Sequence, residues 1–153
     1  MEPKAPIIAV DSDIFVRDLR YLRDRDYGVN RQFLEALRTA KNGVTTLYNL
    51  LEICGTLSFN LHSRQLKELY FYYPQRYAIG VVPEPTLLGT LPELDSAQTF
   101  ERILSPMSLG DALIASAIGK YLPEAELFVS WNARHFKLPG IRSLTPRQFL
   151  ASR

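Results

Sequence analysis

The chain has 153 residues, of which 46% are hydrophobic and 22% charged; this fits one globular domain spanning 1–153 and excludes a disordered or fibrous protein. Its net charge of +2 permits a polyanionic partner without requiring one. The single cysteine, Cys54, excludes an internal disulfide, no apolar run reaches membrane-spanning length, and Met1–Pro6 lacks a signal-peptide core. We therefore expect a cytoplasmic protein without a membrane partner.

The first half of the chain predicts strands alternating with helices. Four consecutive apolar residues, Ile7–Val10, are typical of a strand buried on both faces of a parallel sheet. A second strand is expected at Val44–Thr46, where Thr45 or Thr46 can cap the helix that follows. Helices are predicted at Ile14–Leu22, from an Asn30 cap to the turn at Lys41-Asn42-Gly43, and at Leu47–Leu57.

The second half continues this alternation. A helix is predicted at Ser63–Tyr73, where apolar residues recur at helical spacing before Pro74, and a strand is predicted at Tyr77–Val82. Ser108 can cap the most apolar helix, Leu109–Leu122. The other expected elements are a loop at Pro85–Pro92, a helix starting at Asp95 or Ser96, strands at Leu127–Val129 and Ile141–Leu144, and a short helix from Pro146. Strands separated by helices imply right-handed crossovers and a parallel sheet, so the predicted fold class is α/β.

Three acids stand in apolar surroundings, and each has an ordinary explanation. Asp11 follows directly on the first strand, and either it or the nearby Asp13 can cap the next helix. Glu52 falls on a strip of its helix, shared with Asn49, that would be the solvated side. Asp111 comes three residues after Ser108, as in a capping box, although Glu or Gln suits that role better.

Taken together, these acids indicate a metal site. Asp11 ends a strand, Asp111 begins an otherwise apolar helix, and Asn132 follows a later strand. Because the carboxyl ends of parallel strands meet at one edge of a sheet, we expect these side chains and Glu52 to converge there. Carboxylates without Cys or His partners suit Mg²⁺ or Mn²⁺, and such an ion relieves the repulsion between them. The chemistry that these ions commonly support is phosphodiester cleavage.

Four segments of the chain, in this order and spacing, resemble the PIN domain family, in particular the VapC-like toxins of toxin–antitoxin pairs. The segments are Ile8–Asp13, Thr45–Glu52, Leu109–Ala115 and Phe128–Phe136, within a resemblance that spans roughly Ile7–Leu150. The resemblance implies a three-layer α/β/α fold around a mostly parallel sheet of four to five strands. It also implies a Mg²⁺- or Mn²⁺-dependent endoribonuclease that cleaves RNA to 5′-phosphate and 3′-hydroxyl ends. Homodimers, and inhibition by a cognate antitoxin that inserts a segment into the acidic site, are implied as well.

The resemblance also assigns roles to matching positions. The candidate catalytic residues, which are candidate metal ligands too, are Asp11, Glu52 and Asp111. Asn132 stands where many members of the family carry a fourth acid, so it is the fourth candidate ligand, with a weaker hold on a second ion. Ser12 is expected to orient substrate or water, and Asp13 to cap the helix or support the ligands from behind.

Residues near Asn132 are candidates for RNA contact. An exposed indole at Trp131 can stack on a base, which is worth about 1–3 kcal/mol, although packing in the core explains this residue equally well. Arg134 can contact phosphate. The aromatic run Tyr70–Tyr73 has more aromatic surface than one buried helix face needs, so we expect it at a dimer or antitoxin contact.

Two other functions are compatible with these residues. A PIN-like domain whose metal site is weakened by Asn132 would bind RNA or a protein without cleaving. A phosphotransferase would use Asp11 as nucleophile with Asp13 beside it, but the residues that follow Asp13 do not fit that reaction, and Glu52 has no part in it.

Overall fold

The structure is a computed structural model that describes residues 4–153; residues 1–3, part of the segment expected to lack a signal peptide, lie outside the described residues. Its strands form one sheet, all parallel, in the order β3-β2-β1-β4-β5. The strands are β1 (Ile8–Val10), β2 (Gly43–Thr46), β3 (Gly80–Val82), β4 (Leu127–Val129) and β5 (Arg142–Leu144). The predicted α/β class with a parallel sheet is confirmed.

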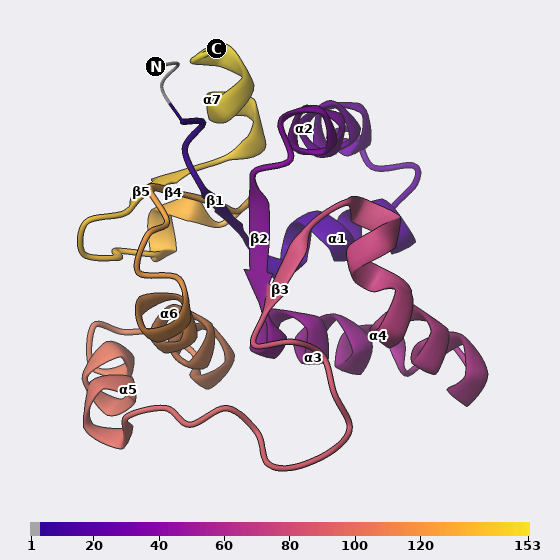
Figure 1. Cartoon of the computed structure of the whole chain (residues 1–153). Coiled ribbons are helices and arrows are strands. Elements are labelled where there is room, and N and C mark those ends of the chain that lie inside the picture. The colour runs from indigo at the N-terminus through magenta and orange to yellow at the C-terminus, as the bar shows by residue number, and fades with distance from the viewer. Residues whose placement is uncertain (1–3) are drawn as a thin grey trace.

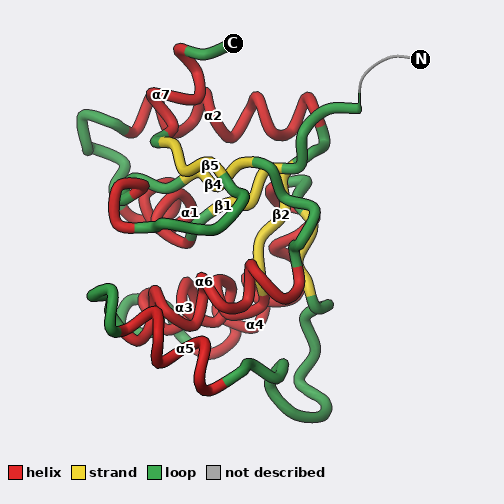
Figure 2. The backbone as a smooth tube through the Cα atoms, turned by 90° about the vertical axis from the view of Figure 1, so that its left-hand side faces the viewer, coloured by secondary structure: helices red, strands yellow, loops and turns green. Residues whose placement is uncertain are grey.

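Helices cover both faces of this sheet. They are α1 (Ser12–Arg20), α2 (Tyr27–Ala40), α3 (Leu47–Leu57), α4 (Ser63–Tyr77), α5 (Ser96–Ile103), α6 (Leu109–Tyr121), α7 (Pro146–Ala151) and the 3-10 turn η1 (Ala133–His135). Figure 1 shows α5 and α6 on the opposite side of the strands from α1 and α4. In Figure 2, α2 and α7 lie side by side at the top, where they pack together.

The central strand β1 shows how the sequence produces these layers. Successive side chains of a strand point to opposite faces, so Ile8 and Val10 enter the core formed with α1–α4, while Ala9 faces α6. The small Ala9 lies in the same buried core as Ala115 of α6. All three strand residues are at most 1% exposed, as expected for a parallel sheet covered on both faces.

Two element boundaries differ from those expected. α2 begins at Tyr27 rather than after an Asn30 cap, because the Asn30 side chain is buried and donates to the Ile14 carbonyl at 2.8 Å. α4 continues through Pro74 to Tyr77, and β3 is correspondingly shorter. Pro74 costs the helix one hydrogen bond, but the buried side chains around it keep the last turn in place.

The register of β1 and β4 brings their carboxyl ends together. Val10 pairs with Val129, and the backbone N–H of Asp11 donates to the Val129 carbonyl at 3.0 Å, so Asp11 and Ser130 leave the sheet as neighbours. β2 ends at Thr46, which caps α3. Within residues 4–153, no helix is both long and apolar enough to cross a membrane.

Candidate functional site

Asp11 is held rigidly where β1 ends and α1 begins. Its side chain is 5% exposed, and its Oδ1 accepts hydrogen bonds from the backbone N–H of Ser12 at 2.8 Å and the Asn49 amide at 3.3 Å. Its Oδ2 accepts the hydroxyl proton of Ser130 at 2.7 Å. Burial, followed by the charge of Asp13, holds the pKa of Asp11 well above its ordinary value, although the bonds from Ser130 and Ser12 act against this.

Glu52 lies one turn beyond Asn49 on α3 and is half-buried rather than fully solvated. Burial raises its pKa, a hydrogen bond with Ser12 lowers it, and the charge of Asp111 raises it again. A Cβ atom on Gly110 would lie 3.1 Å from the Glu52 Oε2, closer than ordinary contact. The glycine therefore makes room for the carboxylate against the first turn of α6.

Asp111 occupies that first turn and is half-buried. Its backbone N–H donates to the Ser108 Oγ at 3.2 Å, so Ser108 caps α6 as predicted. Among the described residues, the Asp111 carboxylate does not return a bond to the backbone of Ser108, so only half of a capping box forms. The carboxylate is left available for other contacts.

The acids at this edge act on one another electrostatically. The charges of Asp13 and Glu52 both raise the pKa of Asp11, and the charge of Asp111 raises that of Glu52. None of the ion pairs within residues 4–153 includes Asp11, Glu52 or Asp111. Among the described residues, Asp11, Glu52 and Asp111 therefore have no basic side chain within ion-pair distance.

This donor set suits a hard divalent cation by its chemistry. All the ligating atoms offered are carboxylate oxygens, they repel one another, and Gly110 leaves space beside Glu52. In this conformation the side chains do not close into a cage: across residues 4–153, no three His, Cys, Asp or Glu side chains lie close enough to hold a metal ion. The assignment of Asp11, Glu52 and Asp111 as ligands therefore stays a prediction.

Asn132 and Ser12 lie on either side of Asp11. Asn132 is exposed three residues after the end of β4, and its backbone N–H donates to the Ser130 Oγ at 3.0 Å. The Ser12 hydroxyl accepts from the Asn49 amide at 3.0 Å and contacts Glu52. Ser12 is therefore placed between two acids, while ligation by the Asn132 side chain remains a prediction.

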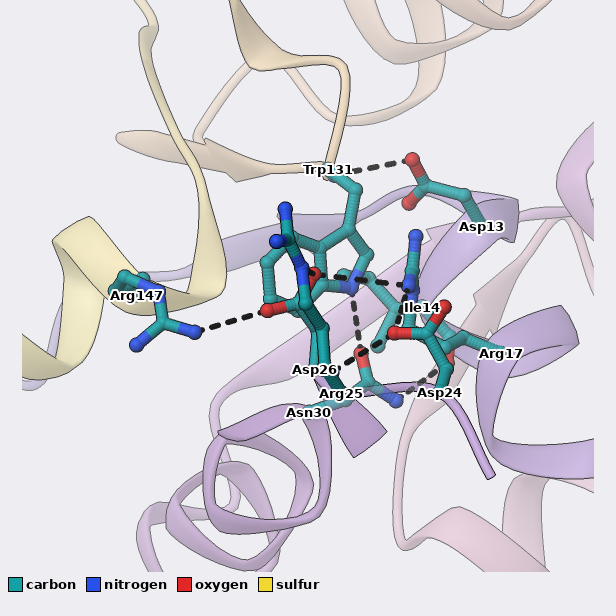
Figure 3. A network of polar contacts seen from close by, with 9 residues as sticks. All are labelled: Asp13, Ile14, Arg17, Asp24, Arg25, Asp26, Asn30, Trp131 and Arg147. Carbon is teal, nitrogen blue, oxygen red and sulfur yellow. Dashed lines mark hydrogen bonds and ion pairs between the residues drawn. The ribbon is translucent and has the colours of Figure 1, made fainter. Parts of the chain in front are cut away.

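Asp13 ties the first turn of α1 to the segment after β4. Its Oδ2 accepts from the Trp131 backbone N–H at 3.0 Å and lies 3.1 Å from the Ser130 Oγ, as an alternative acceptor to Asp11 for the hydroxyl proton, and Figure 3 shows the bond to Trp131. Burial raises the pKa of Asp13 to about 6, against the opposing effects of these bonds and of Arg17. Asp13 does not cap α1, a position that Asp11 takes. Its role in supporting the candidate ligands stays a prediction.

The indole of Trp131 is half-buried and packs against the core. Its Nε1 donates to the Asn30 Oδ1 at 2.8 Å, and the Arg17 guanidinium lies over the ring, 4.7 Å from its centroid (Figure 3). Arg134 is exposed on η1 and donates to a ring nitrogen of His135 at 3.4 Å. Contact of Trp131 or Arg134 with RNA remains a prediction.

The aromatic run on α4 divides between the core and the surface. Tyr70 and Tyr73 are buried, whereas Phe71 and Tyr72 are 46% and 65% exposed. Tyr72 lines a groove of about 580 Å³ between α1, α3 and α4. The expected excess of aromatic surface is therefore present, and what covers it stays a prediction.

Two residues of the site, Asn49 and Ser130, are not anticipated from the sequence. Each contacts Asp11 through its side chain, and both are fully buried. The signal for Ser130 is its place at the end of a strand in register with β1. The helical strip that places Asn49 on the solvated side is misleading, because its pairing with the Thr46 cap turns it inward.

Strand order, helical layers and the acidic edge together define a PIN-like α/β/α fold. No protein-family model and no curated protein sequence matches this chain. Solved structures do match in fold. A chain of the DNA-bound VapBC structure from Salmonella typhimurium aligns with a TM-score of 0.59 at 13% identity, covering 93% of this chain and 99% of that one.

A second similar structure is FitAB bound to an IR36 DNA fragment. Its TM-score is 0.56 at 13% identity, with 92% of this chain and 95% of that chain covered. The two similarities extend over nearly the whole of each chain, so this protein and its structural neighbours share the complete fold. The predicted PIN-like, VapC-type fold is confirmed.

Proposed function

We propose that this protein is a Mg²⁺- or Mn²⁺-dependent endoribonuclease and the toxin of a toxin–antitoxin pair. The observation that carries the proposal is the group of acids Asp11, Glu52 and Asp111 at the carboxyl edge of the sheet. The charge of Glu52 raises the pKa of Asp11, the charge of Asp111 raises that of Glu52, and residues 4–153 supply the three acids with no ion-pair partner. A divalent cation is the counter-charge that such a group requires.

Asp11, Glu52 and Asp111 would hold the ion, with Asn132 as a further oxygen ligand. When bound, such an ion polarises a phosphate and lowers the pKa of a coordinated water. Ser130 and Asn49 fix the Asp11 oxygens, so this carboxylate needs little reorganisation to bind. Glu52, whose pKa is raised by burial and by Asp111, would complete the coordination of the ion or take a proton from the bound water.

The proposed partners are an antitoxin and a second copy of the chain, in the cytoplasm. Both structural neighbours carry the names of two-component assemblies, VapBC and FitAB. The exposed Phe71 and Tyr72 offer apolar surface of the kind found in protein interfaces. The single cysteine is consistent with a reducing compartment.

The test is cleavage of a mixed RNA pool by the purified protein in Mn²⁺ or in EDTA. We expect the wild type to cleave RNA in Mn²⁺ but not in EDTA. The cleavage rate in Mn²⁺ should fall about 100-fold or more in Asp11→Asn and Asp111→Asn. Glu124→Gln, which neutralises an exposed acid outside the site, is the matched control and should retain full activity.

Two outcomes would overturn the proposal. RNA that is bound but stays intact in Mn²⁺ would favour the non-catalytic binding module. Release of phosphate from small phosphoesters, with a phosphorylated Asp11 trapped on the chain, would favour the phosphotransferase.

A further inference from the structure

We propose that the pocket beside Trp131 binds one unpaired nucleotide of a single-stranded RNA, next to the acidic edge. The pocket has a volume of about 560 Å³ and is lined by Arg25, Asp26, Trp131, Thr145 and Arg147. This size falls in the range of roughly 300–1,000 Å³ that is usual for small-ligand sites. The inference rests on the proposed function, because it takes RNA as the substrate.

Trp131 presents a rigid aromatic surface. Its indole N–H is held by Asn30 and its backbone N–H by Asp13, at 2.8 and 3.0 Å. The guanidinium of Arg17 stacks on the ring and is itself fixed by Asp24 at 2.8 Å (Figure 3). A base that stacks on an aromatic side chain already fixed in place loses little binding energy to ordering that side chain.

Two arginines supply positive charge from different elements. The side chains of Arg25, in the loop before α2, and Arg147, on α7, are 93% and 63% exposed. Asp26 holds both, at 4.0 Å from the Arg25 Nε and 2.9 Å from the Arg147 Nη2 (Figure 3). Exposed ion pairs contribute at most about 1 kcal/mol, so either guanidinium can turn to a phosphate group.

The pocket is linked to the acidic edge through the segment that carries Trp131, whose backbone N–H donates to Asp13. Trp131 stands between Ser130, which donates to Asp11, and Asn132. In this proposal, a strand whose phosphate lies over the acids would place a neighbouring nucleotide at the indole. Only an unpaired base can offer its face for this contact, because bases in a duplex stay stacked on one another.

Trp131 is the only tryptophan of the chain, so its fluorescence reports on the pocket directly. The probe is a single-stranded oligouridylate, titrated in EDTA into the Asp11→Asn protein so that no cleavage takes place. We expect saturable quenching by the single strand and little by an RNA duplex of the same length. Absence of quenching, or equal quenching by the duplex, would overturn the inference.

Substitutions locate the contact. Arg25→Ala and Arg147→Ala should each weaken binding about fivefold or more. Each should also reduce the slope of log binding constant against log salt concentration by about 0.7. The matched control is Arg64→Ala, which removes an 85% exposed arginine and its ion pair with Glu68 on α4, outside the pocket. An equal loss in Arg64→Ala would show general charge attraction and contradict the inference.

Labelled RNA and anisotropy extend the test to the indole itself. Trp131→Phe should keep binding within about threefold, and Trp131→Leu should lose about fivefold or more. Should Trp131→Leu fail to fold by circular dichroism, the arginine variants still decide. If the wild type cleaves RNA in Mn²⁺ and the pocket variants bind RNA as tightly as the wild type, this inference is wrong and the proposed function stands. If RNA quenches the Trp131 fluorescence but the wild type cleaves no RNA in Mn²⁺, the proposed function is wrong instead.

Discussion

At the scale of single residues, two buried acids compete for one hydroxyl proton. Ser130 has one such proton but lies 2.7 Å from an Asp11 oxygen and 3.1 Å from an Asp13 oxygen. It can donate to one carboxylate at a time, so the other faces a hydroxyl oxygen without its proton. This arrangement is unfavourable when both acids are charged. It lies at the edge of the sheet where the catalytic site is proposed.

The pKa shifts give this competition a measurable pH dependence. The folded chain binds protons at Asp11 and Asp13 more tightly than the unfolded chain does, because both pKa values are raised on folding. The free energy of unfolding should therefore fall as the pH rises from about 4 through about 6, where Asp13 loses its proton.

Asp11→Asn should remove much of the fall in the free energy of unfolding between pH 4 and pH 8. We expect the variant to exceed the wild type in stability at pH 8, and by much less at pH 4, in EDTA. The amide that this substitution introduces can donate to the Ser130 hydroxyl, which then donates to Asp13, so no bond is left unmade. Thermal unfolding followed by circular dichroism checks this. A variant less stable than the wild type at pH 8 would contradict it, and Glu124→Gln should follow the wild type at every pH.

At the scale of elements, apolar contacts hold α6 against the sheet, and a glycine sets how closely its first turn approaches α3. Gly110 lets the first turn of α6 approach the Glu52 carboxylate on α3. Elsewhere on the same helix, a Cβ at Gly119 would meet only Arg102, at an ordinary 3.5 Å. Substituting each glycine by alanine therefore distinguishes the effect of helix propensity on stability from the effect of crowding Glu52 on cleavage.

Gly119→Ala should stabilise the fold by up to about 1 kcal/mol, since alanine favours helix, and leave RNA cleavage unchanged. Gly110→Ala should change stability by less than about 1 kcal/mol but reduce cleavage about tenfold, because its methyl group displaces Glu52. Urea unfolding and initial cleavage rates measure the two effects. Equal cleavage by both variants would refute the role given to Gly110.

The elements that the sequence predicts well are those with an unambiguous local signal. Short apolar runs locate β1 and β4, and the Ser108 cap and apolar face locate α6. The predicted Asn30 cap is wrong because that side chain is used in a contact across 101 residues, to Trp131. Local patterns carry no information on such a partner.

The candidate site is likewise predictable from the sequence only where a local pattern indicates a residue's position. Acids that follow strands can be expected at one edge of a parallel sheet, and Asp11 lies there. The roles of Ser130 and Asn49 depend on strand register and on which way a helix face turns, and both follow from the whole fold.

At the scale of the whole molecule, every layer contributes to the acidic edge. The sheet supplies Asp11, α3 supplies Glu52, and α6 reaches over from the opposite face with Asp111 (Figure 1). A cation bound by all three would link elements that otherwise meet mainly through apolar contacts. Its binding free energy would add to the stability of the folded chain.

Thermal unfolding at pH 7.5 in Mn²⁺ and in EDTA measures this link directly. With Mn²⁺ at about 100 times its dissociation constant, we expect the wild type to gain about 2.7 kcal/mol, or roughly 5–10 °C in Tm. Asp11→Asn, already stabilised in EDTA, should gain little, as should Glu52→Gln and Asp111→Asn, while Glu124→Gln should gain as much as the wild type. A wild-type Tm that Mn²⁺ leaves unchanged, or an equal gain in all three site variants, would contradict a metal centre built from Asp11, Glu52 and Asp111.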